Sequence, residues 1–152
     1  MPKASVKRLI ECKKKDLIEL VLDIERYPEF VPFCFDAKIH ENKNEGNLTK
    51  IIADLTIGKG PFKDTYKSDV IFNEKEDSIF VKNIEGPLNH LSNNWMFIDK
   101  KNGITEVTFD IDFEIKNRFL NSLMVVSFQF GLEKIADAFQ KRAEELFSNS
   151  KN

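Results

Sequence analysis

The chain has few of the residues on which disulfide-rich proteins and metal sites depend. It contains two cysteines and two histidines among 152 residues. Cys12 and Cys34 form no CxxC pair, and His40 and His90 are isolated from each other and from the cysteines. Because a disulfide framework needs more cysteines and a metal site needs clustered ligands, we expect reduced thiols and no metal site or cofactor.

The sequence also lacks the signatures of the common catalytic sites and of a membrane span. It has no GxSxG, P-loop or GxGxxG motif. It has no stretch of about 18 or more apolar residues, and the initial MPKASVKRLIECKKK contains no apolar segment of the signal-peptide type. We therefore expect a cytoplasmic protein without catalytic residues, whose contact with a membrane is peripheral and at the inner face.

The charge balance argues against a protein that binds DNA. The formal net charge is −2 and the sequence pI is about 5.8, whereas neutralisation of phosphates by basic residues supplies most of the affinity for nucleic acid. Basic residues do crowd the N-terminus, at Lys3, Lys7, Arg8, Lys13, Lys14 and Lys15. They fit a solvated strand end and helix start, which is the default interpretation, or a weak attraction to anionic lipid.

The aromatic residues are mostly phenylalanine. The chain has 14 Phe but only 2 Tyr and 1 Trp, and phenylalanine brings apolar area without a polar group. This composition indicates a Phe-rich core or an apolar cavity lined by rings. The core is the default, and the cavity needs further support.

Hydrophobic periodicity predicts an order of strand, helix, apolar elbow, six strands and long helix. We expect the first strand at 5–11, the first helix at 14–25 and the elbow at 27–35, and the later strands at 37–41, 48–57, 64–72, 78–85, 94–99 and 106–115, followed by a helix at 117–147. Turns are expected at 42–47, 58–61, 74–77, 86–89 and 100–103. The helix should end near Tyr27, because Pro28 disfavours the helical conformation of the residue before it.

The last predicted strand has the clearest pattern. Its apolar residues alternate strictly with polar ones, and the polar set is Thr108, Asp110, Asp112 and Glu114. A period of two gives one buried and one wet face, which is typical of an antiparallel sheet. The acidic residues should therefore lie on a solvated face and form no acid–base site. Residues 1–152 are expected to form one α+β domain, with an antiparallel meander of about seven strands against the terminal helix.

The terminal helix begins with an unusual segment. From residue 133 onward the helix is amphipathic, but FLNSLMVVSFQFGL at 119–132 is apolar nearly all round. Such a helix is buried on every side or touches something apolar. Both interpretations remain open for Leu123, Met124, Phe128 and Leu132, which lie on its apolar stripe.

Four sequence blocks, in order, resemble one known family. DIERYPEFVP at 23–32 is similar to the family's D-x-E-x-Y-P-x-F-[VL]-P segment, and EGPL at 85–88 with WMF at 95–97 is similar to its x-G-P-F…W-x-F. FDIDFEI at 109–115 and AFQKRA at 138–143 resemble its F-x-I-x-F-E-F strand and A-F-x-x-R-A helix. The family is the coenzyme Q-binding START-domain family, within the polyketide cyclase and lipid-transfer superfamily. It includes bacterial ribosome-association toxins.

The resemblance implies a helix-grip (START-like) fold in which a curved antiparallel sheet wraps around the C-terminal helix. It further implies a tunnel for ubiquinone or a similar polyisoprenoid, a carrier or chaperone role supporting respiratory electron transport, and no catalytic residues. Leu88 stands where the family usually has Phe, a change that keeps a large apolar side chain. The chain is less basic than expected of a ribosome-binding member, which counts against the toxin alternative.

The candidate ligand-binding residues come from the elbow, one strand and the terminal helix. They are Tyr27, Pro28, Phe30, Val31, Phe33, Trp95, Phe97, Leu123, Met124, Phe128 and Leu132. For each group a plain core role is the alternative, and for Trp95 and Phe97 it is favoured. Three functions are therefore carried forward: a quinone carrier, a ribosome-associated protein that interferes with subunit association, and an aromatase or cyclase-like enzyme.

Overall fold

The computed structural model describes residues 3–59, 62–85, 88–115 and 118–147. Seven strands form one sheet: β1 (Lys3–Ile10), β2 (Cys34–Glu45), β3 (Leu48–Lys59), β4 (Phe62–Asn73), β5 (Ser78–Glu85), β6 (Leu88–Asp99) and β7 (Thr105–Ile115). The helices are α1 (Lys14–Leu22), α2 (Tyr27–Phe30) and α3 (Arg118–Phe147), with 3₁₀ turns η1 (Ile24–Arg26) and η2 (Lys101–Gly103).

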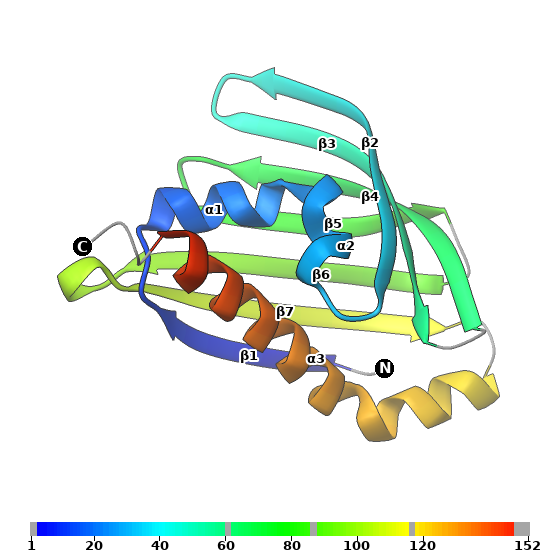
Figure 1. The fold of residues 1–152 in the computed structure, drawn as a ribbon. Coiled ribbons are helices and arrows are strands. Elements are labelled where there is room, and N and C mark those ends of the chain that lie inside the picture. Colours follow the sequence, from blue (N-terminus) through cyan, green and yellow to red (C-terminus); the bar gives the residue numbers. More distant parts are fainter. Residues whose placement is uncertain (1–2, 60–61, 86–87, 116–117, 148–152) are drawn as a thin grey trace.

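The sheet is an antiparallel meander closed at one edge by the first strand. Its order is β1-β7-β6-β5-β4-β3-β2, so that every neighbouring pair except β1 and β7 is also consecutive along the chain. All three helices lie on one face of the curved sheet (Figure 1). This arrangement confirms the predicted helix-grip class and leaves the other face of the sheet uncovered.

Burial follows the alternation that the sequence predicts. On β7, Val107 is buried while Asp110 on the opposite face is exposed. On β1, Val6 and Ile10 are buried but Leu9 is 58% exposed. The period of two therefore separates a helix-covered face from a solvated one on both strands.

Several predicted boundaries need correction. The first helix ends at Leu22, before the predicted end at residue 25. Tyr27 has helical dihedral angles (φ −53°, ψ −39°) and opens the short helix α2, whose first turn tolerates Pro28. The turn predicted at 42–47 is mostly strand, because β2 continues to Glu45 and turns at Gly46, whose φ is +62°. A two-residue hairpin turn favours glycine at such a positive φ.

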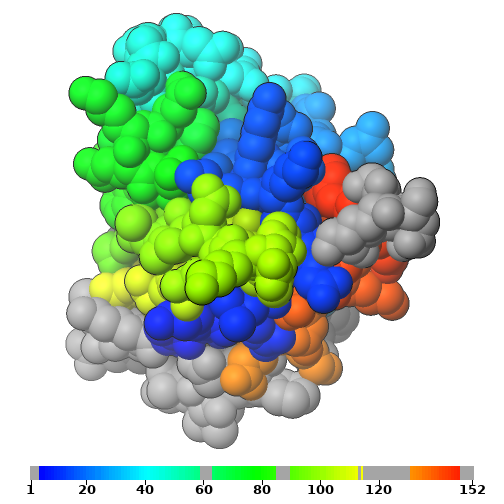
Figure 2. All heavy atoms as spheres, turned by 90° about the vertical axis from the view of Figure 1, so that its left-hand side faces the viewer, coloured from blue at the N-terminus to red at the C-terminus, as the bar shows by residue number. Residues whose placement is uncertain are grey.

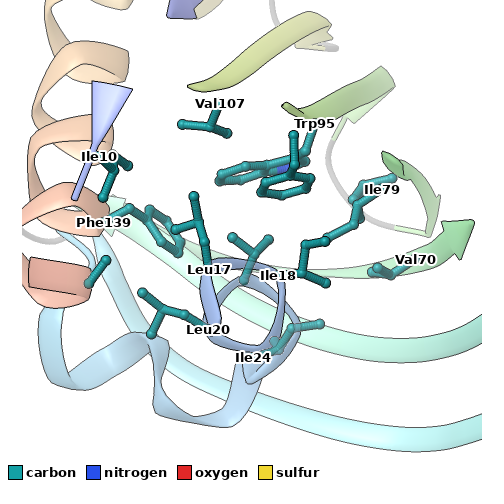
Figure 3. Packing of buried hydrophobic residues seen from close by; sticks show 14 of the residues in the cluster. Ile10, Leu17, Ile18, Leu20, Ile24, Val70, Ile79, Trp95, Val107 and Phe139 are labelled. Carbon is teal, nitrogen blue, oxygen red and sulfur yellow. The ribbon is translucent and has the colours of Figure 1, made fainter. Parts of the chain in front are cut away.

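The main core lies between the sheet and the helices. Figure 3 shows Leu17, Ile18 and Leu20 of α1 among side chains of the sheet and α3. The most deeply buried members of this cluster include Ile10, Leu17, Ile51, Ala53, Ile79 and Ala143, all at most 1% exposed. Burying each leucine or isoleucine side chain stabilises the fold by roughly 1.5–3 kcal/mol before the conformational entropy of ordering it is counted.

Two ion pairs link the start of α1 to the sheet. The Nζ atom of Lys14 lies 2.7 Å from Oδ2 of Asp77, in the β4–β5 turn, and 3.3 Å from Oδ2 of Asp99, at the end of β6. Figure 2 views this end, where α1 and the turns of the sheet touch.

Among the described residues, no helix combines the length and apolarity of a membrane span.

Candidate functional site

An aromatic cluster joins the elbow, α3 and the centre of the sheet. The ring of Phe139 on α3 makes edge contacts with Tyr27 and Phe30 of α2, at centroid distances of 5.4 and 5.2 Å. It also lies 5.2 Å from Trp95 on β6, which in turn lies 4.2 Å from Phe109 on β7. Edge and tilted arrangements of this kind are the preferred geometries of aromatic pairs.

The four sequence blocks that resemble the coenzyme Q-binding family supply this cluster. Tyr27 and Phe30 come from the first block, Trp95 from the second, Phe109 from the third and Phe139 from the fourth. Residues that are far apart in the sequence therefore join in one cluster. The helical stripe includes Phe139 and the alternating strand includes Phe109, but neither pattern indicates that both rings contact Trp95.

An apolar space lies beside this cluster, between α3, α1 and the strands β1, β7 and β6. It has about 360 Å³ of unfilled volume, its opening to solvent included. The lining residues are Val6, Arg8, Ile10, Leu17, Trp95, Val107, Phe109, Ile135, Ala136 and Phe139. Arg8 is the ionisable member of this set, and its guanidinium is paired with the carboxylate of Asp137 on α3.

The predicted site residues are brought together only in part. Trp95 lines the apolar space, while Phe97 is 3% exposed and stacks at 6.4 Å from Trp95 within the core. Leu132 is buried, at 3% exposure. Leu123, Met124 and Phe128 belong to α3, but their side chains lie outside the described part of the structure.

The elbow residues divide between the core and the surface. Tyr27, Phe30 and Val31 are half-buried and pack against the main core, whereas Pro28 is exposed. Phe33 is half-buried, and a Cβ atom placed on Gly131 of α3 would lie 3.9 Å from its Cε2 atom. The elbow therefore covers α3 at two levels, beside Gly131 and beside Phe139.

Burial favours the uncharged forms of the Tyr27 hydroxyl and of the Cys34 thiol. The Tyr27 hydroxyl donates to the carbonyl oxygen of Val21, and burial raises the pKa of Tyr27 well above its usual range. Burial also raises the pKa of the Cys34 thiol to about 11. A neutral thiol is a poor nucleophile, so Cys34 packs as a small apolar residue.

The remaining polar candidates lie away from this cluster. His40 pairs with Asp54 at 2.7 Å on the uncovered face of the sheet, and His90 lies 3.6 Å from Asp112 on the same face. In the described ranges, no group of three or more His, Cys, Asp or Glu side chains is placed to hold a metal ion.

The structure separates the basic residues of the N-terminus. β1 runs beside α3, whereas residues 13–15 lie at the start of α1, at the far end of the sheet from the start of α3 (Figure 1). Lys14 is paired with Asp77 and Asp99, while Lys13 and Lys15 are exposed. The basic segment is thus not one continuous surface.

Comparison with known proteins gives consistent matches over the whole fold. The family model described as "Polyketide cyclase / dehydrase and lipid transport" matches residues 13–140. The ribosome association toxin RatA of Rickettsia prowazekii is 33% identical over 142 residues, 91% of this chain and 94% of that protein. The mitochondrial coenzyme Q-binding protein COQ10 of Dictyostelium discoideum is 29% identical over 135 residues, 86% of this chain and 63% of that protein.

A solved structure has the same architecture. A START superfamily protein from Mycobacterium smegmatis matches with a TM-score of 0.82 at 19% sequence identity, over 96% of this chain and 99% of that one. At this identity the match shows a common fold. It agrees with the seven-stranded sheet and C-terminal helix described above.

Proposed function

Because the chain belongs to the polyketide cyclase/dehydrase and lipid transport family, we propose that it binds ubiquinone or a similar polyisoprenoid lipid and acts as its carrier. The apolar space between α3 and the sheet is the observation that carries this proposal. Nine of its ten lining residues are uncharged, and eight of those are large apolar or aromatic side chains. Pockets for hydrophobic ligands are lined in this way, with few polar groups.

The size of the space indicates that binding needs a conformational change. Only about 20 Å³ of it admits a water-sized molecule, far less than the roughly 300–1,000 Å³ of small-molecule sites. A head group with a long isoprenoid tail requires more room than this. The proposed carrier therefore has a closed form, and the lipid enters when part of the helical cover moves.

Binding rather than catalysis fits the chemistry of the lining. General acid–base catalysis needs an ionisable group within reach of the substrate and with a suitable pKa. Arg8 cannot act as a general base, because an arginine side chain has hydrogen-bond donors and no acceptor. We accordingly propose a protein that is not an enzyme, in contrast to an aromatase or cyclase.

Trp95 provides the test, because it is the single tryptophan of the chain and lines the apolar space. Purified protein titrated with ubiquinone should show saturable quenching of indole fluorescence. Ala136→Phe places a ring in the space and should weaken binding about tenfold, as expected for an overpacked site. Glu133→Phe, an exposed position one turn away on α3, is the matched control and should bind like the wild type. Equal binding by both variants would place the ligand elsewhere.

Ribosome association is the second candidate, and the similarity to RatA over nearly the whole chain supports it. In this case the protein would bind ribosomal subunits and lower their association. Sedimentation with large ribosomal subunits at increasing salt tests this function directly, because contacts to RNA phosphates weaken as salt rises. Co-sedimentation that persists at low salt and disappears at high salt would favour it over the carrier.

Peripheral membrane contact is proposed as the route by which a carrier exchanges its lipid. Anionic lipid attracts exposed lysines by roughly 1 kcal/mol each near the surface. Flotation with vesicles containing or lacking anionic lipid should show whether such contact occurs. If the protein stays in the unbound fraction with both kinds of vesicle, it makes no such membrane contact.

A further inference from the structure

We propose that Arg8 binds the polar end of the lipid, and that it selects a neutral head group with a carbonyl oxygen over a fatty-acid anion. This inference rests on the proposed function and deepens it, because it names the chemistry of the ligand at the same site. Arg8 lines the apolar space, and the other nine lining residues have no ionisable side chain. The indole N–H of Trp95 is a further polar group there, but it already donates to Oδ1 of Asn93 at 3.0 Å.

Arg8 occupies a position on β1 where the strand pattern predicts an apolar residue. Val6 and Ile10 on either side of it are buried, and residues at this spacing share one face of a strand. Its cross-strand partner on β7 is Val107, which also lines the apolar space. A charged side chain on a covered face loses hydration. An aliphatic residue would fill this position without that loss, so an arginine here indicates a use for its N–H groups.

The side chain of Arg8 reaches from the apolar wall to the surface. The wall is almost wholly apolar, so the methylene stem of Arg8 forms part of it and the guanidinium lies at its edge, as long basic side chains commonly arrange. The guanidinium pairs with Asp137, whose side chain is 65% exposed, whereas that of Arg8 is 25% exposed. The polar end of a bound lipid would therefore lie at the boundary between β1 and α3, with its tail directed inward toward the buried rings of Trp95 and Phe139.

The guanidinium of Arg8 has more donors than partners. An arginine side chain carries several N–H groups and no acceptor. Apart from the pair with Asp137, Nη2 lies 3.5 Å from the backbone carbonyl oxygen of Glu133, which is longer than an ordinary hydrogen bond. In the part of the chain that the structure describes, its N–H groups have no other partner. Arg8 can therefore donate to a ligand oxygen while it keeps its carboxylate partner.

The carboxylate of Asp137 determines which head group is favoured. Because it already balances the positive charge of Arg8, a quinone carbonyl would gain a hydrogen bond from a charged donor without adding a charge to the site. A fatty-acid carboxylate would instead lie close to the carboxylate of Asp137, and the two negative charges would repel each other. The pair therefore favours a neutral carbonyl, which ubiquinone has.

The first test compares Arg8→Met with Asp137→Asn by ubiquinone quenching of Trp95 fluorescence. Both variants lose the same ion pair between β1 and α3, so they are matched for any structural effect of that pair. Arg8→Met keeps an apolar stem but has no donor, and it should weaken ubiquinone binding about tenfold. Asp137→Asn leaves the arginine free to donate to the ligand and should strengthen binding about twofold. An equal loss in both variants would mean that Arg8 acts only through the ion pair, which would overturn the proposal.

The second test uses oleate as a competitor for ubiquinone. Oleate should compete weakly with the wild type and about tenfold better with Asp137→Asn, because the unbalanced charge of Arg8 then attracts its carboxylate. This comparison does not depend on the folding of Arg8→Met. Equal competition in the wild type and Asp137→Asn would contradict the selection of a neutral head group.

The two tests separate failure of this inference from failure of the proposed function. Saturable binding of ubiquinone by the wild type, with the same affinity in folded Arg8→Met, would keep the carrier function and reject Arg8 as the residue that binds the head group. No binding of ubiquinone by folded wild-type protein would reject the carrier function itself, and this inference with it.

Discussion

The indole of Trp95 and the ring of Phe139 lie with centroids 5.2 Å apart and planes at 72°, and this contact joins the middle of the sheet to the C-terminal helix. Both residues are buried, at 9% and 4% exposure. They form one wall of the apolar space and at the same time part of the main core. The proposed carrier thus uses core residues as binding surface, so that binding and stability are coupled.

Phe139→Ala should destabilise the fold strongly, because it removes the ring on which Tyr27, Phe30 and Trp95 converge. A loss of about 3–5 kcal/mol is expected for a buried Phe→Ala change. Leu146→Ala, on the same helix but 51% exposed, should change stability by less than about 0.5 kcal/mol. Urea unfolding followed by circular dichroism measures both. Equal, small effects would mean that α3 is not packed on the sheet at Phe139.

Thr105→Val tests a buried polar link between the start of β7 and the segment after β1. Thr105 is fully buried and its Oγ1 atom donates to the carbonyl oxygen of Cys12 at 2.7 Å. The variant keeps the shape but leaves that carbonyl unsatisfied, at an expected loss of about 1–3 kcal/mol. Thr56→Val, which breaks an exposed Thr56–Thr65 hydrogen bond, is the control. If both variants unfold at the wild-type urea midpoint, this bond contributes nothing.

The buried thiol of Cys12 should make the free energy of unfolding decrease as the pH rises above about 9. Burial, assisted by Asp16 and Glu144, raises the pKa of its thiol from 9.0 to about 11. The unfolded chain then ionises first, so stability from this group is complete below about pH 9 and is lost as the pH rises through the folded pKa. The difference in unfolding free energy between wild type and Cys12→Ala should fall by on the order of 1.4 kcal/mol per pH unit between these values. A pH-independent difference would contradict the burial of this thiol.

The sequence predicts local structure better than it predicts the site. The alternation of Val107 and Asp110 determines which face of β7 is buried, because the period depends on neighbouring residues alone. Tyr27 departs from prediction because Pro28 is tolerated in the first turn of a helix. The contact of Arg142 with Glu29 joins positions 113 residues apart, and no local pattern indicates that these two residues meet.

The candidate site residues also show that local sequence patterns do not predict which distant residues meet. The apolar elbow was predicted from its composition, and its position over α3 follows from the fold. Ile135 lies on the apolar stripe of the helix and Ala136 lies beside that stripe, and nothing in the sequence pattern indicates that either lines a space. They become site residues only where the curvature of the sheet leaves space between them and Phe109.

Mass spectrometry of the organic extract of gently purified protein tests the central claim most directly. The protein would be produced in a ubiquinone-making host as wild type, Ala136→Phe and Glu133→Phe. We predict near-stoichiometric quinone with the wild type and with Glu133→Phe, and strong depletion with Ala136→Phe. An extract free of polyisoprenoid from folded wild-type protein, together with no binding of added ubiquinone, would contradict the carrier function.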